Sequence, residues 1–493
     1  MVIIDRLKNK YNALGKPAKA SFWYMFCNVV QKGIAFLVVP IYTRVLTLDE
    51  YGLYSTFQSW KEIILIFASL YLYAGVFTKA MVDLENDQKK PYTSSMQGLT
   101  TCLTLTLALI YFPLRSYINP FVEMDTITMG LLLLFCVFSP SINFWSVRQR
   151  VEYKYIKMIL VTIGIALLVP AVSLILLYTT NLRTNAVIWG YLIVNIAVGL
   201  FFYIYNFIQG KAFFHKEYWP RALKYNIPLI PHYLSLIALG QSDKIMIQKL
   251  VGDAEVAIYS LAYQVSMLMI IVISAIDSAL VPWEYENYKN KNYAKVASTC
   301  TKVVMVVGFL IVLATLISPE LVYILGDKQY ADAIWIIPAI SISVAFIYIY
   351  GLFSTIEFYY SNTKFVMIAS SSAAILNIIL NYFCIKSFGY VAAAYTTLFC
   401  YFFLAVIHFI FSLVVKKKNG ITEKIYDWRI LSIIAVILVA TIPGVLLLYK
   451  YMIARYIVLG SLVVLAIIFG RKIIRLFTNL KQKQEEPKLY EEN

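Results

Sequence analysis

Apolar segments long enough to cross a membrane alternate with short polar connections along almost the whole chain. A transmembrane helix needs about 20 mainly apolar residues to span about 30 Å of hydrocarbon. Fourteen segments meet this requirement, so the pattern predicts an all-α integral membrane protein with about 14 transmembrane helices. The predicted spans are residues 21–43, 53–78, 96–114, 127–147, 158–178, 185–208, 227–248, 255–281, 300–319, 332–353, 365–385, 390–415, 430–449 and 453–470.

The composition agrees with this pattern. The 493 residues are 60% hydrophobic and 14% charged, whereas ordinary globular proteins are about half apolar and about a quarter charged. Fourteen spans use roughly 280 residues, which leaves about 14 residues for each loop or tail. A large folded domain outside the membrane is therefore excluded.

The net charge of +16 is explained by topology rather than by a nucleic-acid partner. If the N-terminus lies inside and the spans alternate, 32 of the 43 lysines and arginines fall on the inner side and 8 on the outer side. Cytoplasmic loops of membrane proteins carry such a basic excess. We therefore expect a multi-pass protein of a plasma membrane with both termini in the cytoplasm and with membrane lipids, but no nucleic acid, as partners.

A short repeat divides the spans into two sets. The stretch 44–56 is echoed 205 positions later by 249–261, which pairs Glu50 with Glu255, Tyr54 with Tyr259 and Ser55 with Ser260. This offset sets spans 1–2 against spans 7–8, so the predicted unit is six helices. An even number of helices relates the halves by a parallel pseudo-two-fold axis along the membrane normal, with a central cleft suited to alternating access.

The spans and the repeat predict five parts. They are a basic amphipathic cytoplasmic segment at 1–20, an N-terminal six-helix bundle at 21–225, a C-terminal six-helix bundle at 226–415, two extra transmembrane helices at 416–470 and a cytoplasmic tail at 471–493.

Charged and polar groups inside the spans are the candidate substrate ligands, because a charge at the centre of a membrane helix costs at least about 2.5 kcal/mol. Lysine is a compact cation suited to phosphate, and aromatic rings can contact sugars. Helical spacing places Asn28 and Gln31 on one face with Lys32. The predicted substrate-binding residues are Lys32, Lys61, Lys244, Asn28, Gln31, Tyr259 and Tyr263.

Acidic groups within the spans are weaker candidates for ion coupling, and these are Asp243, Asp277 and Glu62. Simpler explanations remain open for each group. Lys61 and Glu62 can form a local pair, as can Asp243 and Lys244, and stripes of serine and asparagine often join membrane helices by hydrogen bonds.

No enzymatic motif is present in the sequence. The six cysteines lie in apolar stretches without a CxxC pair, so neither a zinc site nor a disulfide framework is expected. The chain has no GxxxxGK[ST], HExxH or GxSxG motif. We expect a protein that is not an enzyme, with no cofactor and no metal site, apart from coupling to H⁺ or Na⁺.

Two local stretches resemble the polysaccharide flippases of the multidrug/oligosaccharidyl-lipid/polysaccharide exporter superfamily. PIYTRVLTLDEYGLYST (40–56) resembles the end of the first helix and the following turn of that family, and SDKIMIQKLVGD (242–253), followed by Tyr259, resembles its seventh-helix region. Ala257 departs from the pattern, because the family often has glycine there. The layout of fourteen spans and the six-plus-six repeat extend the resemblance over essentially the whole chain.

The resemblance implies a flippase that moves undecaprenyl-pyrophosphate-linked oligosaccharide units across the bacterial plasma membrane for O-antigen, capsule or related polysaccharide synthesis. Such proteins use no ATP and are coupled to an ion gradient, and polysaccharide polymerase machinery is an expected partner. A cation-coupled drug exporter and a peptidoglycan-precursor flippase of the same superfamily stay open. So does a membrane polymerase or glycosyltransferase, although the outer loops are short for that class.

Overall fold

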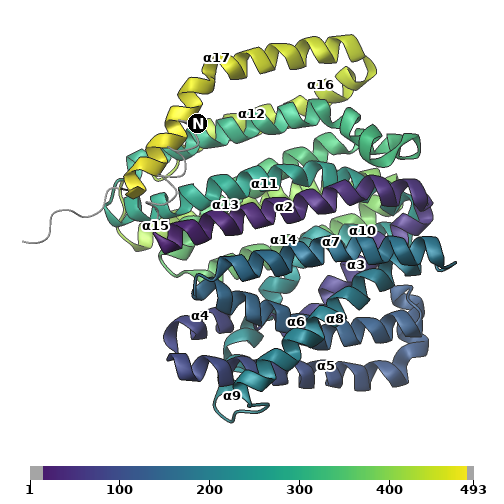
Figure 1. The fold of residues 1–493 in the computed structure, drawn as a ribbon. Coiled ribbons are helices and arrows are strands. Elements are labelled where there is room, and N and C mark those ends of the chain that lie inside the picture. Colours follow the sequence, from purple (N-terminus) through teal and green to yellow (C-terminus); the bar gives the residue numbers. More distant parts are fainter. Residues whose placement is uncertain (1–14, 486–493) are drawn as a thin grey trace, which may run out of the picture. The chain divides into compact units, whose positions relative to one another are not determined.

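The computed structural model describes residues 15–485. Over this range the chain forms sixteen α-helices and two 3₁₀-helices and contains no strand (Figure 1). The predicted all-α fold class is therefore confirmed. The chain divides into two compact units, residues 1–237 and 238–493, which are described separately below.

The first unit is built around α8, which packs against α5, α6 and α7. Small residues allow this close packing: a Cβ on Gly199 would lie 2.7 Å from backbone atoms of Phe138 on α6, and one on Gly190 would lie 2.5 Å from Ser173 on α7. Small residues serve the same purpose in membrane helix pairs generally. The unit contains α2 (Lys16–Val45), α3 (Leu48–Ser69), α4 (Val76–Asp83), α5 (Asn86–Val122), α6 (Thr126–Val151), α7 (Tyr155–Thr179), α8 (Thr184–Gly210), α9 (Tyr218–Asn226), η1 (Ile227–Leu229) and the beginning of α10 (Ile230–Leu250).

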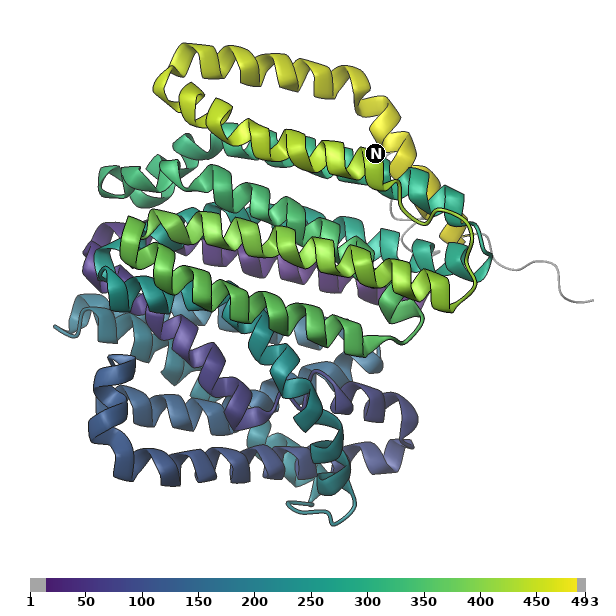
Figure 2. The ribbon, with the colours of Figure 1, turned by 180° about the vertical axis from the view of Figure 1, so that it is seen from behind.

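The second unit is built around α13, whose most apolar 18-residue window is 83% buried. This helix packs against α11, α12 and α15, while α16 and α17 lie beside α12 (Figures 1 and 2). The unit contains the end of α10, α11 (Asp253–Lys289), α12 (Tyr293–Gly326), η2 (Lys328–Trp335), α13 (Ile337–Tyr359), α14 (Thr363–Phe388), α15 (Val391–Lys418), α16 (Trp428–Lys450) and α17 (Met452–Glu485).

A polar contact fastens the last two helices to α12. Arg455 of α17 is 5% exposed and donates to a Glu320 carboxylate oxygen, which also accepts from the Tyr456 hydroxyl at 2.6 Å. Tyr449 of α16 donates to the Thr315 carbonyl at 2.5 Å. Buried polar groups with such partners avoid most of their desolvation cost.

Each of the fourteen predicted spans lies mainly on a helix, but three of these helices fall outside the set that is long and apolar enough to cross a membrane. Eleven helices of the described part are long and apolar enough to cross a membrane. α3 and α10 are outside this set, because each carries several charged residues. The apolar part of α17, Met452–Ile468, is shorter than 18 residues. The count of fourteen therefore stays a prediction.

The predicted continuous span 53–78 is wrong. α3 ends at Ser69, Leu70 and Tyr71 adopt left-handed backbone angles (φ 47° and 50°), and α4 starts only at Val76. Apolar periodicity continues across the break, so the hydrophobic pattern alone gives no sign of it.

The repeated stretches form matching helix junctions. α2 ends at Val45 and α3 begins at Leu48, while α10 ends at Leu250 and α11 begins at Asp253, each 205 positions later. Both junctions thus have two linking residues. The first is closed by a capping box, in which Thr47 accepts from the Glu50 backbone N–H and the Glu50 carboxylate accepts from the Thr47 N–H.

The two ends of the chain are only partly described. Of the predicted amphipathic segment 1–20, residues 1–14 lie outside the described part. At the other end, α17 continues beyond the predicted last span and into the predicted tail, as far as Glu485.

Candidate functional site

Asp243 lies at the centre of a buried polar cluster in the second unit and is 1% exposed. Its Oδ1 accepts a hydrogen bond from Asn381 Nδ2 at 2.6 Å. Its Oδ2 accepts from the hydroxyls of Tyr259 at 2.5 Å and Thr397 at 2.6 Å. Four helices, α10, α11, α14 and α15, therefore meet at this one carboxylate.

A second layer of polar groups orders these partners. Asn377 lies one turn before Asn381 on α14, and its Oδ1 accepts from Asn381 Nδ2 at 3.1 Å and from Ser242 at 2.9 Å. Thr396 donates to Asn381 Oδ1. The cluster thus supplies one carboxylate, two carboxamides and several hydroxyls. Hard cations such as Na⁺ prefer oxygen ligands of these kinds, and a proton binds to the carboxylate itself.

Asp243 has no basic partner among the described residues, even though Lys244 is adjacent in sequence. The Lys244 ammonium instead lies 3.3 Å from Gln241 Oε1 and 5.3 Å from the centroid of the Tyr263 ring. An ionised carboxylate buried without a counter-charge costs several kcal/mol. The site therefore has the chemistry to bind a small cation or a proton.

Lys61 is the most buried of the three predicted lysines, with 6% of its surface exposed. Its ammonium lies 2.6 Å from Gln58 Oε1, 3.0 Å from the Tyr191 hydroxyl and 3.2 Å from Glu62 Oε1. It also lies 4.5 Å from the centroid of the Tyr191 ring. The local pair with Glu62 is therefore real, and the Glu62 side chain remains 34% exposed.

Asn28, Gln31 and Lys32 are exposed on α2, as expected for groups that share one face of a helix. In the described part of the chain Lys32 has no hydrogen-bond or ion-pair partner. The structure does not join these residues to Lys61, and their part in binding stays a prediction.

The three acidic candidates lie in different places. Asp243 belongs to the cluster and Glu62 pairs with Lys61. Asp277 is half-buried on α11, about 27 Å further along the helix axis than Tyr259. Tyr259 is fully buried and serves the Asp243 carboxylate, whereas Tyr263 is partly exposed.

Of the partners of Asp243, sequence reasoning included Tyr259 in the site but not Asn381 or Thr397. Asn377 and Asn381 are four residues apart on α14, so their common face was visible in the sequence. Thr396 and Thr397 carry no such signal, because threonine occurs throughout the spans and only packing of α15 against α14 brings them to Asp243.

A second set of buried acids lies in the same unit. Glu357 of α13 pairs with His408 of α15 at 2.9 Å, and both side chains are almost completely buried. Glu284 of α11 accepts from the Cys300 thiol at 3.0 Å and is also fully buried. No group of three or more metal-ligating residues forms among the described residues.

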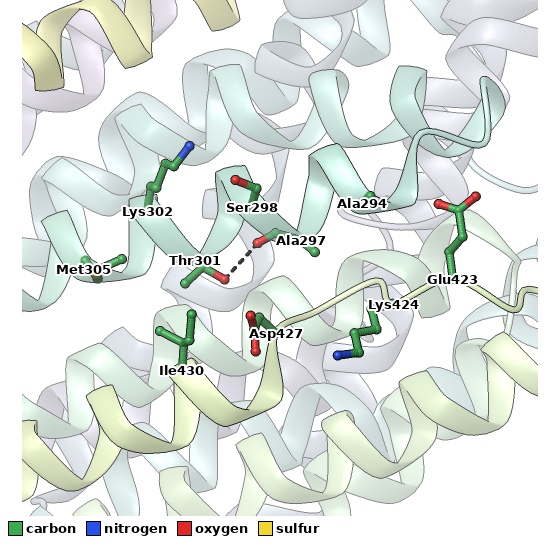
Figure 3. Close-up of a pocket in the computed structure, with 10 residues that line it drawn as sticks. All are labelled: Ala294, Ala297, Ser298, Thr301, Lys302, Met305, Glu423, Lys424, Asp427 and Ile430. Carbon is green, nitrogen blue, oxygen red and sulfur yellow. Dashed lines mark hydrogen bonds between the residues drawn. The ribbon is translucent and has the colours of Figure 1, made fainter.

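A hollow of about 510 Å³ lies between the start of α12 and the α15–α16 connection (Figure 3). Lys302, Glu423, Lys424 and Asp427 line it together with small side chains. In Figure 3 Lys302 extends away from Asp427, while the Thr301 hydroxyl is bonded to the Ala297 carbonyl at 2.8 Å. Charges of both signs without a buried acceptor or donor give this hollow no preference for one ligand.

The link between α7 and α8 clamps the first repeated junction. Arg183 donates from Nε and Nη2 to the two carboxylate oxygens of Glu50, both at 2.7 Å, and from Nη2 to the Val45 carbonyl at 3.0 Å. These bonds from Arg183 hold the pKa of the Glu50 carboxyl below its ordinary value. Bidentate pairs of this kind have a fixed geometry.

Comparison with protein families identifies two matches. The model of the family described as "Polysaccharide biosynthesis protein" matches residues 18–287, which is more than half of the chain. The model of the family described as "MatE" matches residues 228–383.

Two curated proteins of Haemophilus influenzae are similar in sequence. The "Lsg locus putative protein 1" is 26% identical over 387 residues, which is 73% of this chain and 89% of that protein. An "Uncharacterized membrane protein" is 23% identical over 370 residues, which is 71% of this chain and 86% of that protein.

Solved structures of transporters have the same fold. The lipid II flippase MurJ in an inward closed conformation gives a TM-score of 0.62 at 13% identity, over 88% of this chain and 99% of that chain. An inward-facing multidrug resistance MATE family transporter of the MOP superfamily gives 0.60 at 13% identity, over 80% and 96% of the two chains. With its apolar helices and this fold, the chain is a multi-pass membrane protein that belongs to the polysaccharide biosynthesis protein family.

Proposed function

We propose that the protein is a flippase that moves undecaprenyl-pyrophosphate-linked oligosaccharide units across the bacterial plasma membrane. It would serve the synthesis of O-antigen, capsule or a related polysaccharide by ion-coupled alternating access, without ATP hydrolysis and without catalysis. Membership of the polysaccharide biosynthesis family supports the pathway. The observation that carries the transport mechanism is the buried Asp243 carboxylate, which has three donors and no counter-charge within residues 15–485.

Ion binding at Asp243 provides the coupling. A cation or proton at the carboxylate removes the cost of a buried charge, so the ion-bound and ion-free states of the cluster prefer different packing of α10, α11, α14 and α15. α10 begins in the first unit and ends in the second, so a displacement at Asp243 acts on a helix that both units share. Through such a two-state element, an ion that moves down its gradient drives a larger substrate against its own gradient.

Basic groups of the spans bind the pyrophosphate in this proposal. Lys32 is exposed on α2. The Lys61 ammonium lies beside the Glu62 carboxylate, whose side chain is 34% exposed. The fold shared with a lipid II flippase supports a lipid-linked substrate. The basic excess of the inner loops supports cytoplasmic termini.

Substitution of Asp243 by Asn tests the proposal. The change keeps the shape of the side chain but removes its charge and its titration. In cells that lack the chromosomal copy, we expect Asp243→Asn to reduce surface polysaccharide by more than tenfold at an unchanged amount of membrane protein. Asp277→Asn is the matched control, because Asp277 is an acid of the same unit outside the cluster.

Reconstituted vesicles separate transport from other steps. The rate at which the lipid-linked oligosaccharide becomes accessible to an impermeant oxidant should rise with an imposed sodium or pH gradient in the wild type and not in Asp243→Asn. Unchanged gradient dependence in the variant would remove Asp243 from coupling, and absence of any wild-type transport would remove the flippase function.

A cation-coupled drug exporter is the second candidate, because the MatE family model matches residues 228–383, which contain Asp243 and its partners Tyr259 and Asn381. Lysines inside the spans disfavour cationic drugs. Resistance of the deletion strain to organic cations, compared with the complemented strain, distinguishes the two functions.

A further inference from the structure

The two halves of the protein differ in the helix that follows the repeated junction. In the first unit, α3 is interrupted after Ser69 and the chain resumes helical structure as α4 at Val76. In the second unit the corresponding region of α11 is an unbroken helix from Asp253 to Lys289. The fold therefore does not require the break, so the break calls for an explanation in the first unit itself.

The break is held in an unfavourable backbone conformation. Leu70 and Tyr71 are consecutive non-glycine residues with positive φ angles. Each costs on the order of 1 kcal/mol or more, and such residues cluster at ligand sites. Leu70 and Leu72 point into the apolar core formed with Phe77 and Phe144, so Tyr71 is left on the other side of the chain.

Aromatic side chains meet at this outward side. The Tyr71 ring lies 5.2 Å from the Tyr233 ring with an angle of 28° between their planes, and 5.2 Å from the Tyr73 ring. The Tyr71 hydroxyl lies 3.5 Å from Glu62 Oε2. All three tyrosines are only partly buried, and the Tyr73 ring also packs against Phe144 of the apolar core.

An unused acceptor lies beside the rings. Asn226 is completely buried and donates to the Leu70 carbonyl at 2.8 Å, but its Oδ1 has no hydrogen-bond partner among the residues that the structure describes. This oxygen lies 3.3 Å from the place where a Cβ on Gly75 would stand, and the Tyr233 hydroxyl lies 3.2 Å from the same place. Together with Tyr225 Cε1, 3.5 Å from the same place, these atoms enclose it, so glycine at position 75 lets the chain pass close to Asn226 and Tyr233. The Asn226 amide therefore holds the break from inside the unit.

We propose that the α3–α4 break is a sugar-binding platform, formed by Tyr71, Tyr73 and Tyr233 with Glu62 as the hydrogen-bond acceptor. The face of an aromatic ring is electron-rich and packs against the weakly positive C–H groups of a pyranose. The partly exposed carboxylate accepts from sugar hydroxyls. This inference rests on the proposed function and assigns the glycan end of the substrate to this place.

The position of the platform gives it a role in loading. α3 has 22 residues from its outer junction at Leu48, so the break lies about 33 Å away, at the cytoplasmic end of the first unit in the predicted topology. A glycan assembled on the cytoplasmic face would contact these tyrosines before transport.

The charge of the platform selects the kind of sugar. The Lys61 ammonium is already paired with Glu62, Gln58 and Tyr191, so no free cation faces the rings from α3. The partly exposed Glu62 carboxylate repels a uronic acid. The platform therefore suits a neutral or N-acetylated hexose.

Binding by the purified full-length protein tests the platform. The probes are the lipid-linked oligosaccharide extracted from cells that lack the protein, and undecaprenyl pyrophosphate without sugar. We expect the wild type to bind the first about tenfold more tightly than the second. Tyr71→Gly should abolish this difference while leaving the affinity for undecaprenyl pyrophosphate unchanged. Tyr71→Phe should keep most of the difference.

Two comparisons exclude an effect through folding. Tyr71→Gly relieves the positive φ angle, so its thermal stability should equal or exceed that of the wild type. Tyr153→Ala is the matched control, because Tyr153 is another half-exposed tyrosine with a positive φ angle, at the α6–α7 connection. It should leave the sugar-dependent gain intact.

The outcomes separate the platform from the transport function. Retention of the full sugar-dependent gain by Tyr71→Gly, in a preparation whose wild type moves the lipid across vesicles, overturns the platform alone. A wild type that neither binds nor moves the glycolipid overturns the proposed function together with the platform.

Discussion

Lys61 offers a direct test of whether a buried charge serves binding or stability. Replacement by Met keeps the length and the apolar volume of the side chain but removes the ammonium. Its bonds to Gln58 and Tyr191 and its pair with Glu62 are then lost. Because Glu62 is 34% exposed, its carboxylate can still be hydrated.

The expected stability change follows from opposing terms. Hydrogen bonds to a charged group contribute about 1.5–3 kcal/mol each, a partly exposed ion pair up to about 1 kcal/mol, and the contact with the Tyr191 ring about 0.5–1 kcal/mol. Desolvation of the ammonium costs several kcal/mol in the opposite direction. The terms nearly cancel, so we expect Lys61→Met to change the free energy of unfolding by less than about 2 kcal/mol.

Binding and transport should respond more strongly than stability. If Lys61 contacts the pyrophosphate, Lys61→Met should weaken the binding of undecaprenyl pyrophosphate by tenfold or more, since a charge-assisted bond to phosphate is lost. Lys154→Met is the matched control, because Lys154 forms a 2.5 Å pair with Glu152 at an exposed position. A variant that unfolds readily but binds normally would show that Lys61 has a structural role only.

Two further predictions concern packing and pH. Gly199→Val should prevent the close approach of α8 and α6 and destabilise the protein by about 1–3 kcal/mol or more, measured by thermal unfolding in detergent against Gly351→Val, whose Cβ would meet no atom within 4 Å. The pKa of the Glu50 carboxyl is lower in the folded protein than its ordinary value. The pair with Arg183 therefore stabilises the protein fully at a pH above the ordinary pKa, and this stabilisation is lost as the pH falls through the folded-state pKa. Wild type and Glu50→Gln should therefore differ in melting temperature at neutral pH and converge in acid, whereas a constant difference at every pH would contradict the pairing.

The sequence was sufficient for the fold class because hydrophobic periodicity is a local property. Each predicted span lies mainly on a helix, and the repeated junctions at Val45–Leu48 and Leu250–Asp253 were visible as similar sequences. The break after Ser69 was not, since it depends on a hydrogen bond from Asn226, 156 positions away, to the Leu70 carbonyl.

The candidate site was predictable only in part, for the same reason. Asp243 was recognisable as an acid within a span and Tyr259 as an aromatic candidate for substrate contact, but not as partners of each other. Whether a charge has a counter-charge is a tertiary property, however. Lys244 follows Asp243 directly and yet turns to Gln241, while the donors to the carboxylate come from Asn381 and Thr397, more than 130 positions further along the chain.

The enclosure of α13 has a consequence for biogenesis. Glu357 is completely buried, and its partner His408 is 51 positions further along the chain. At a synthesis rate of about 5–20 residues per second, Glu357 waits roughly 3–10 s before that partner has been made. The nascent helix must spend this interval shielded by the insertion machinery or by α11 and α12, which precede it. The order of the helices along the chain thus sets a time during which assembly of the second unit depends on protection from lipid.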